Sequence, residues 1–180
     1  MKILGDFHKS LIIQEIKKAM LFRQAKPKER QSLFEEGYKE WSKNRTFEQY
    51  CIDNGKEDAY GKRFVIEDHG EIVSSTIMLD LKKINGNKVY GIGSVLTPKI
   101  HTGKGYATQL LKNCIKRIHD DHAYIFLYSD INPSFYQRLD FKILPSKFQK
   151  YSKSICMVYC QDRLLDELLR SPIEQIPNYF

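Results

Sequence analysis

A strand followed by a glycine turn and a helix constrains this chain most. Residues 89–97 form a run of small and apolar residues typical of a strand, and Pro98 ends it. Residues 101–107 form the turn His-Thr-Gly-Lys-Gly-Tyr-Ala. After this turn, apolar residues recur at spacings of one, three and four as far as Ile118, which predicts an amphipathic helix.

The turn has the features of an anion-binding site. The first turn of a helix presents backbone N–H groups that have no partner within the helix, and it carries a partial positive charge. Glycine lets the backbone approach a bulky anion, so Gly103 and Gly105 favour binding of a diphosphate. Two known phosphate loops are excluded, because neither G-x-G-x-x-G nor G-x-x-x-x-G-K-[ST] can be read here. An ordinary turn without a ligand stays open as the alternative.

The glycine turn fits a third pattern, which reads Arg or Gln, two free positions, Gly, one free position, then Gly or Ala. Thr102, Gly105 and Ala107 occupy these positions. Thr102 departs from the pattern because it lacks the long polar side chain of Arg or Gln. Its backbone N–H is kept, so we expect weaker binding of the anion and not its loss.

A second pattern follows downstream. Residues 124–128 read as a buried strand, and a loop leads to Phe135-Tyr136, three residues, Asp140 and Phe141. Together the two patterns, within residues 88–145, resemble the signatures of the GNAT superfamily of acyl-CoA-dependent N-acetyltransferases. The family has Gly where Asp140 stands. We expect Asp140 to adopt a left-handed conformation, which Asp tolerates better than most residues.

The resemblance implies a fold and a reaction. The fold is α+β, an α/β sandwich of the GNAT-like acyl-CoA N-acyltransferase type, with a mixed, mostly antiparallel twisted sheet and helices on both faces. The reaction is transfer of an acetyl group from acetyl-CoA, the cosubstrate, to a primary amine by direct attack. The backbone of Val95, Leu96 and Thr97 would pair with the pantetheine amides. The diphosphate would lie against Thr102, Gly103, Lys104, Gly105, Tyr106, Ala107 and Thr108.

The same resemblance points to catalytic groups. Tyr136 matches the family's usual general acid, which protonates the departing CoA thiolate; a tyrosine that only packs is the alternative. A phenol has a pKa of about 10 and a thiol about 8.5, so the site has to assist this transfer. The family often places a glutamate base on the strand at residues 90–97, and this strand has none. Asp130 and Asp80 remain as candidate bases, whereas His69 and His101 read as turn residues.

The helix pair expected at residues 27–41 and 47–54 forms the acceptor side in the family. By resemblance, the residues that could line this side are Tyr38, Trp41, Asn44, Arg45 and Phe47, and those that could attract a cationic amine are Glu35, Glu36 and Glu40. The simpler alternative is that the aromatic residues form core and the acids form a solvated helix face.

The chain of 180 residues predicts one N-acetyltransferase domain over residues 1–180. Residues 1–20 would be a helical extension, with a helix at 9–20, and residues 161–180 a C-terminal helix, capped by Asp162, and tail. We expect strands at 21–25, 141–144 and 154–160, and hairpin turns at 68–71 and 85–87.

Composition and charge exclude several classes of protein. No apolar run approaches the roughly 18 residues of a membrane span and no secretory signal is evident, so we expect a cytoplasmic protein without a membrane partner. The four cysteines lack a CxxC pair, which predicts reduced core thiols, and no metal site is expected. The net charge of +7 suits an anion such as CoA.

Basic residues are scattered, so a nucleic-acid partner is not expected. A CoA-binding regulatory or interaction protein without turnover is the alternative function. A homodimer stays open, because the N-terminal helix and the leucine-bearing tail are apolar additions to the core.

Overall fold

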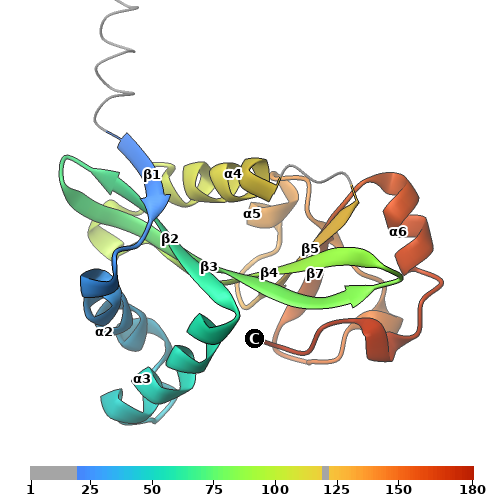
Figure 1. The fold of residues 1–180 in the computed structure, drawn as a ribbon, viewed down its shortest axis with the longest axis horizontal. Coiled ribbons are helices and arrows are strands. Elements are labelled where there is room, and N and C mark those ends of the chain that lie inside the picture. The colour runs from blue at the N-terminus through green and yellow to red at the C-terminus, as the bar shows by residue number, and fades with distance from the viewer. Residues whose placement is uncertain (1–19, 119–121) are drawn as a thin grey trace, which may run out of the picture.

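A seven-stranded sheet in the order β1-β2-β3-β4-β5-β7-β6 runs through the molecule (Figure 1). The computed structural model describes residues 20–118 and 122–180. Strands β4 and β5 are parallel and every other neighbouring pair is antiparallel, which confirms the expected mixed sheet. The strands are β1 Met20–Gln24, β2 Gly61–Asp68, β3 Glu71–Ile84, β4 Asn87–Leu96, β5 Ala123–Ser129, β6 Lys142–Ile143 and β7 Ile155–Tyr159.

Helices cover both faces of the sheet: α4 lies on one side, and α2 and α3 lie on the other (Figure 1). The α-helices are α2 Arg30–Trp41, α3 Phe47–Gly55, α4 Tyr106–Ile118, α5 Ser134–Gln137 and α6 Asp162–Leu168. Short 3-10 turns are η1 Pro27–Glu29, η2 Lys56–Ala59, η3 Lys99–His101, η4 Ser146–Phe148 and η5 Ile173–Gln175. The α+β fold expected from the sequence is confirmed.

Strand β5 separates two hydrophobic clusters, because alternate residues of a strand face opposite sides. Ile125 and Leu127 pack in a cluster with Leu110 and Leu111 of α4. Tyr124 and Phe126 belong to a second cluster, formed with α6 and the C-terminal segment. Strand β5 is therefore buried on both faces and holds its C-terminal end, next to the site described below, in a fixed position.

Both hairpin turns form as expected. His69 and Gly70 have φ of 48° and 82°, and Asn85 and Gly86 have 49° and 81°. These left-handed conformations give the two-residue turns that match the twist of paired strands. Asp140 has a φ of 64°, so the left-handed geometry expected there is also confirmed.

Several expected boundaries shift. Met20 opens β1 and does not end a helix, whereas residues 9–19 of the expected helix lie outside the described residues. The expected helix from Ser134 ends at Gln137, and its carbonyls are instead bonded in a turn that leads to Asp140. Thr46 caps α3 as expected through Gln49 N, but Gln161 is the N-cap of α6, and Asp162 is its first residue.

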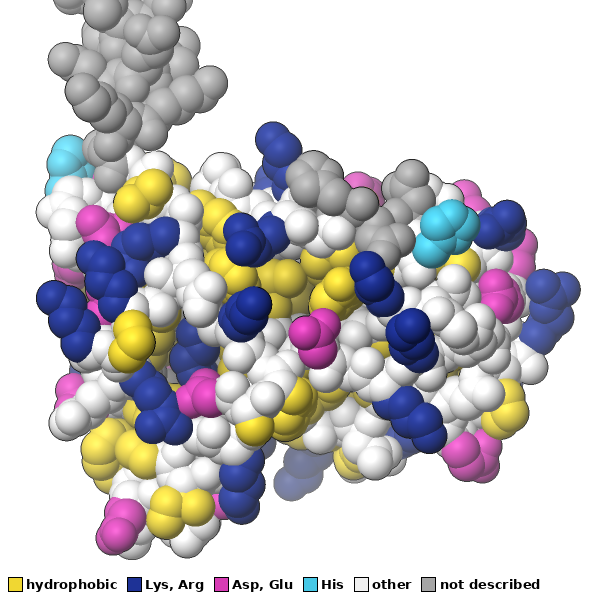
Figure 2. Space-filling view, in the orientation of Figure 1, with side chains coloured by type: hydrophobic (Ala, Val, Ile, Leu, Met, Phe, Trp, Pro, Cys, Tyr) yellow, Lys and Arg dark blue, Asp and Glu magenta, His cyan; other side chains and the backbone are white. Residues whose placement is uncertain are grey.

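Lys and Arg side chains are distributed over the face in Figure 2 and are interspersed with Asp and Glu. This face therefore carries no single basic patch of the kind that nucleic-acid-binding proteins use. Across the described ranges, no helix is long and apolar enough to span a membrane.

Candidate active site

A bulge in β4 separates β4 from β5 where the site lies. Ile77 pairs with Gly93 and Ser75 with Leu96, so three steps along β4 match two steps along β3. The extra residue is accommodated at Ser94, whose φ is 48°. Pairing of β4 with β5 stops at Gly91, opposite Phe126. Beyond that point, the edge of β4 that faces β5 has no strand partner among the residues that the structure describes.

Hydroxyl groups of β3 hold the bulge in place. The Ser74 hydroxyl donates to the Leu96 carbonyl oxygen at 3.0 Å, and the Thr76 hydroxyl donates to the Gly93 carbonyl oxygen at 2.8 Å. The Ser74 hydroxyl also lies 2.9 Å from that of Thr97. Buried carbonyl groups that lose their ladder partner need another donor, and these side chains supply it.

A cavity of about 300 Å³ occupies the space between the separated strands and the α2–α3 connection. Its lining includes β4 residues 92–95 and the end of β5. Aromatic side chains dominate the wall: Trp41, Tyr50, Tyr128, Tyr136, Tyr179 and Phe180. Three carboxylates also line it: Asp53, Glu57 and Asp130.

Tyr136 lies in this cavity and is 7% exposed. Helix α5 presents it between the rings of Phe135 and Phe141, whose centroids are 4.9 and 6.1 Å away. Burial, with the nearby negative charge of Asp130, raises the pKa of Tyr136 to about 12. The phenol is therefore protonated over the whole physiological pH range and is able to donate.

Asp130 also lines the cavity, but both its oxygens are engaged. Its Oδ2 accepts a hydrogen bond of 2.8 Å from the Tyr179 hydroxyl, and its Oδ1 accepts one from Ser154. Asp130 thus fastens the C-terminal segment to the end of β5.

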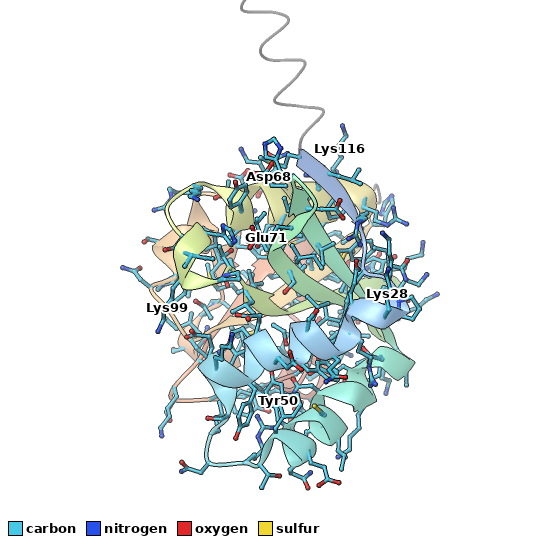
Figure 3. The ribbon with its side chains drawn as sticks, turned by 90° about the vertical axis from the view of Figure 1, so that its left-hand side faces the viewer. Lys28, Tyr50, Asp68, Glu71, Lys99 and Lys116 are labelled. Carbon is cyan, nitrogen blue, oxygen red and sulfur yellow. The ribbon has the colours of Figure 1, made fainter. Side chains whose placement is uncertain are left out.

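The other candidate base from the sequence does not join this group. Asp80 lines a different cavity, beside Tyr90 and Arg117. His69 lies in the β2–β3 turn, and His101 is buried with its Nε2 3.0 Å from a Glu71 oxygen. Figure 3 shows Glu71 near the β2–β3 turn, on the other side of α2 from Tyr50. The described residues contain no group of three or more His, Cys, Asp or Glu side chains that could hold a metal ion.

The acceptor-side residues expected from the sequence divide between wall and core. Trp41 and Arg45 line the cavity. Tyr38 packs edge-on against Phe47 and donates to the Arg45 carbonyl oxygen at 2.9 Å, so it supports the wall from behind. Glu36 and Glu40 line a separate cavity on the other side of α2.

The glycine turn precedes α4 and presents open backbone. Gly103 and Gly105 have φ of 78° and 82°, which disfavours any residue with a Cβ, and an added Cβ would meet no atom within 4 Å. The Gln109 N–H closes the first helical turn on the Gly105 carbonyl oxygen at 3.0 Å. The glycines thus serve the backbone conformation and leave room for a ligand.

Two side chains of the turn are used within the protein. The Thr102 hydroxyl donates to the Lys99 carbonyl oxygen at 2.8 Å. The Tyr106 hydroxyl donates to Asp68 and ties α4 to the end of β2. Any contribution of these two residues to anion binding therefore comes from their backbone.

The C-terminal segment closes one side of the cavity. The Phe180 ring packs over β4, where a Cβ on Gly91 would lie 2.8 Å from it, and one on Gly93 would lie 3.6 Å away. The Tyr128 ring packs at a tilt against Tyr179 and edge-on against Phe180, with centroids 5.3 and 5.7 Å away. Alternate glycines in a strand signal close approach of another group, and here that group is Phe180.

Gly91→Ala is expected to lower the free energy of unfolding by about 1–3 kcal/mol, because the new methyl overlaps the Phe180 ring. Urea unfolding measures this change. Gly93→Ala is the matched control and should cost less. In a Phe180→Ala background the cost of Gly91→Ala should shrink, and an unchanged cost would contradict the contact.

Comparison with known proteins gives a family match. A family model for the acetyltransferase (GNAT) domain matches residues 22–144. A search of curated proteins gives no match.

Solved structures show the same fold at low identity. A probable N-acyltransferase from Enterococcus faecalis V583 has a TM-score of 0.59 at 13% identity, over 69% of this chain and 32% of that one. Arabidopsis thaliana Naa50, in complex with the bisubstrate analogue CoA-Ac-MVNAL, has a TM-score of 0.59 at 16% identity, over 78% of this chain and 96% of that one. A Brucella melitensis GNAT acetyltransferase in complex with acetyl-CoA has a TM-score of 0.56 at 18% identity, over 79% of this chain and 90% of that one.

The present chain thus spans about a third of the Enterococcus protein and nearly all of the other two chains. The family model covers well over half of the present chain, including the bulged strand, the glycine turn and Tyr136. The chain belongs to the GNAT superfamily of acetyltransferases.

Proposed function

We propose that this protein transfers an acetyl group from acetyl-CoA to a primary amine, with Tyr136 as the general acid. The observation that carries the proposal is the cavity between β4 and β5. It is lined by the buried Tyr136 side chain and by the part of β4 that does not pair with β5. The glycine turn begins a few residues after the end of that strand. Cofactor backbone contacts and the proton donor are thus available on adjoining parts of the chain.

Backbone N–H and C=O groups would bind most of the acetyl-CoA. The backbone of Val95 and Leu96 at the end of β4, and of Thr97 after it, would pair with the pantetheine amides as an added strand would. The backbone from Thr102 through Thr108 offers the first-turn N–H groups of α4 to the diphosphate, and Lys104 adds a positive charge. Fixing the thioester next to the amine removes much of the entropic cost of bringing them together.

Tyr136 would protonate the departing thiolate. With a pKa of about 12, the phenol is a weaker acid than a thiol near 8.5, so this transfer is uphill by itself. It becomes favourable when the nitrogen of the new amide, which still carries an excess proton, returns a proton to the Tyr136 oxygen. Asp130 contributes negative charge beside Tyr136, and its role as a base stays a prediction.

Release of free CoA thiol from acetyl-CoA in the presence of a panel of primary amines tests the proposal. Amine-dependent thiol release with formation of the acetylated amine supports it. Binding of acetyl-CoA without amine-dependent thiol release would instead favour the alternative, a regulatory CoA-binding protein. Two observations support that alternative: β4 has no carboxylate, and the Thr102 hydroxyl is bonded within the protein.

A cytoplasmic location, a homodimer and a single domain over residues 1–180 stay predictions. Cell fractionation would test the cytoplasmic location, and analytical ultracentrifugation would test the homodimer.

A further inference from the structure

The three carboxylates of the cavity differ in how many hydrogen bonds they receive. Asp53 accepts from Gln49 at 2.9 Å, Lys56 at 3.2 Å and Arg45 at 3.1 Å. Asp130 accepts from two hydroxyl groups, as described above. The Oε2 of Glu57 is buried and has no hydrogen-bond partner among the described residues. Glu57 is thus the cavity carboxylate with unused capacity to accept.

The Arg63 guanidinium lies close to Glu57 but does not donate a hydrogen bond to it. Nη2 of Arg63 lies 3.8 Å from Oε2 of Glu57, which is beyond hydrogen-bond distance. That guanidinium donates to Asp58 at 2.8 Å and to the Asn54 carbonyl oxygen at 3.0 Å, and it stacks over Phe34. A buried carboxylate left in this state costs stability, so a role in binding is a reason for its presence.

The rest of the cavity wall combines aromatic side chains with two cations, Lys43 and Arg45. The Lys43 ammonium lies 5.4 Å from the centroid of the Tyr179 ring. The aromatic side chains of Trp41 and Tyr128 line the cavity and offer π-surface and apolar contact to an alkylammonium group, whereas the Tyr50 ring already has the Arg45 guanidinium 5.1 Å from its centroid. The Arg45 guanidinium, which also lines the wall, is held by Asp53 and by two carbonyl oxygens. Its charge is therefore largely balanced, whereas Arg63, the cation beside Glu57, lies 3.8 Å from its Oε2 and donates its hydrogen bond to Asp58 instead.

We propose that Glu57 binds the ammonium group of the acceptor and takes its proton, so that the acceptor is a primary alkylamine that is cationic in solution. This inference rests on the proposed function for its catalytic part. Glu57 would be a catalytic residue, because its carboxylate contacts the nitrogen that reacts.

The proton balance is complete without another reactant. The ammonium gives one proton to Glu57, and the free amine attacks the thioester carbonyl, forming the C–N bond. The C–S bond then breaks, and Tyr136 gives its proton to the thiolate. The nitrogen gives its second excess proton to the Tyr136 oxygen, and Glu57 returns its proton to solvent.

Several titratable and charged groups face Glu57 from the elements packed around it. They are Asp58 beside it, Arg63 of β2, Tyr50 of α3, Tyr60 and Tyr179. Burial raises the pKa of Glu57 above its ordinary value of 4.5, against the smaller opposing effect of Arg63. A raised pKa brings a carboxyl closer to the working pH of a general base.

The raised pKa also separates a catalytic role from a structural one. A carboxyl whose folded pKa exceeds its unfolded pKa stabilises the fold at low pH and loses that contribution as pH rises through the folded value. At pH 8, Glu57→Gln should therefore melt at or above the temperature of the wild type. If Glu57 served mainly as an ion-pair partner of Arg63, the variant would melt lower.

Binding of n-hexylamine, compared with 1-hexanol, tests the ammonium site without turnover. Isothermal titration at pH 7 should show that the wild type prefers the amine about tenfold or more, as expected for a charge-assisted contact. Glu57→Gln should remove this preference. Glu48→Gln, which changes an exposed carboxylate of α3, should keep it. No preference in the wild type, or one that survives in Glu57→Gln, overturns the inference.

Turnover tests the proton transfer. With hexylamine and acetyl-CoA, Glu57→Gln should lower kcat/KM about a hundredfold and abolish its rise with pH on the acid side. Unchanged kcat/KM overturns the role of Glu57 as base. If acetyl-CoA fails to bind the wild type, the proposed function fails, and the hexylamine titration still decides the ammonium site.

Discussion

Gly105→Val is expected to abolish the rise in melting temperature that acetyl-CoA gives the wild-type protein. At 100 times its dissociation constant, a ligand adds about 2.7 kcal/mol to the free energy of unfolding. For a domain of this size that is a rise of about 5–10 °C. The valine side chain would fill the open space beside Gly105, at the start of α4, and would disfavour the φ of 82°. Both effects remove the backbone surface on which a diphosphate would lie.

Gly86→Val is the matched control for this variant. Gly86 has a φ of 81° and equally open surroundings, but it lies in the β3–β4 turn. The two variants should lose similar stability without ligand, roughly 1–3 kcal/mol, because they carry the same backbone strain. Only Gly86→Val should keep the ligand-induced rise. Equal rises in both variants would show that the glycine turn binds no cosubstrate.

Tyr136→Phe is expected to lower kcat about a hundredfold while leaving the acetyl-CoA-induced rise in melting temperature intact. The substitution removes only the hydroxyl group, and positioned acid–base groups contribute at least this factor. The ring would keep its contacts with Phe135 and Phe141. Steady-state thiol release and the thermal scan measure the two quantities separately.

Tyr159→Phe is the control for Tyr136→Phe. The Tyr159 ring also packs against Phe141, at a centroid distance of 5.7 Å, but it does not line the cavity. It should retain wild-type kcat. A Tyr136→Phe enzyme with wild-type kcat would exclude the phenol as proton donor and leave water in that role.

Features that depend on neighbouring residues could be predicted from the sequence. The turns at His69-Gly70 and Asn85-Gly86 follow from the conformations that Gly and Asn adopt easily, and the amphipathic period predicts α4. The end of α5 could not be read in this way. A periodic pattern continues through Leu139 and Phe141, but these side chains pack from a turn and not from a helix.

Features that depend on distant residues were not predicted. Glu57 lies in a short 3-10 turn with Lys56 and Asp58, and this run of charged residues suggests a solvated loop. Only the tertiary structure places it beside Arg63 and in the cavity wall. The packing of Phe180 on β4 was also missed, although the alternation of Gly91 and Gly93 within a strand was a usable signal.

The bulge at Ser94 makes the site depend on the length of β4 more than on its side chains. Deleting Ser94 would bring the numbers of residues on β3 and β4 into agreement, with Leu96 still opposite Ser75. The edge of β4 could then continue along β5, and no catalytic side chain would have been removed. A one-residue deletion in β4 would therefore remove the separation from β5 that forms the cavity, with every candidate catalytic side chain still present.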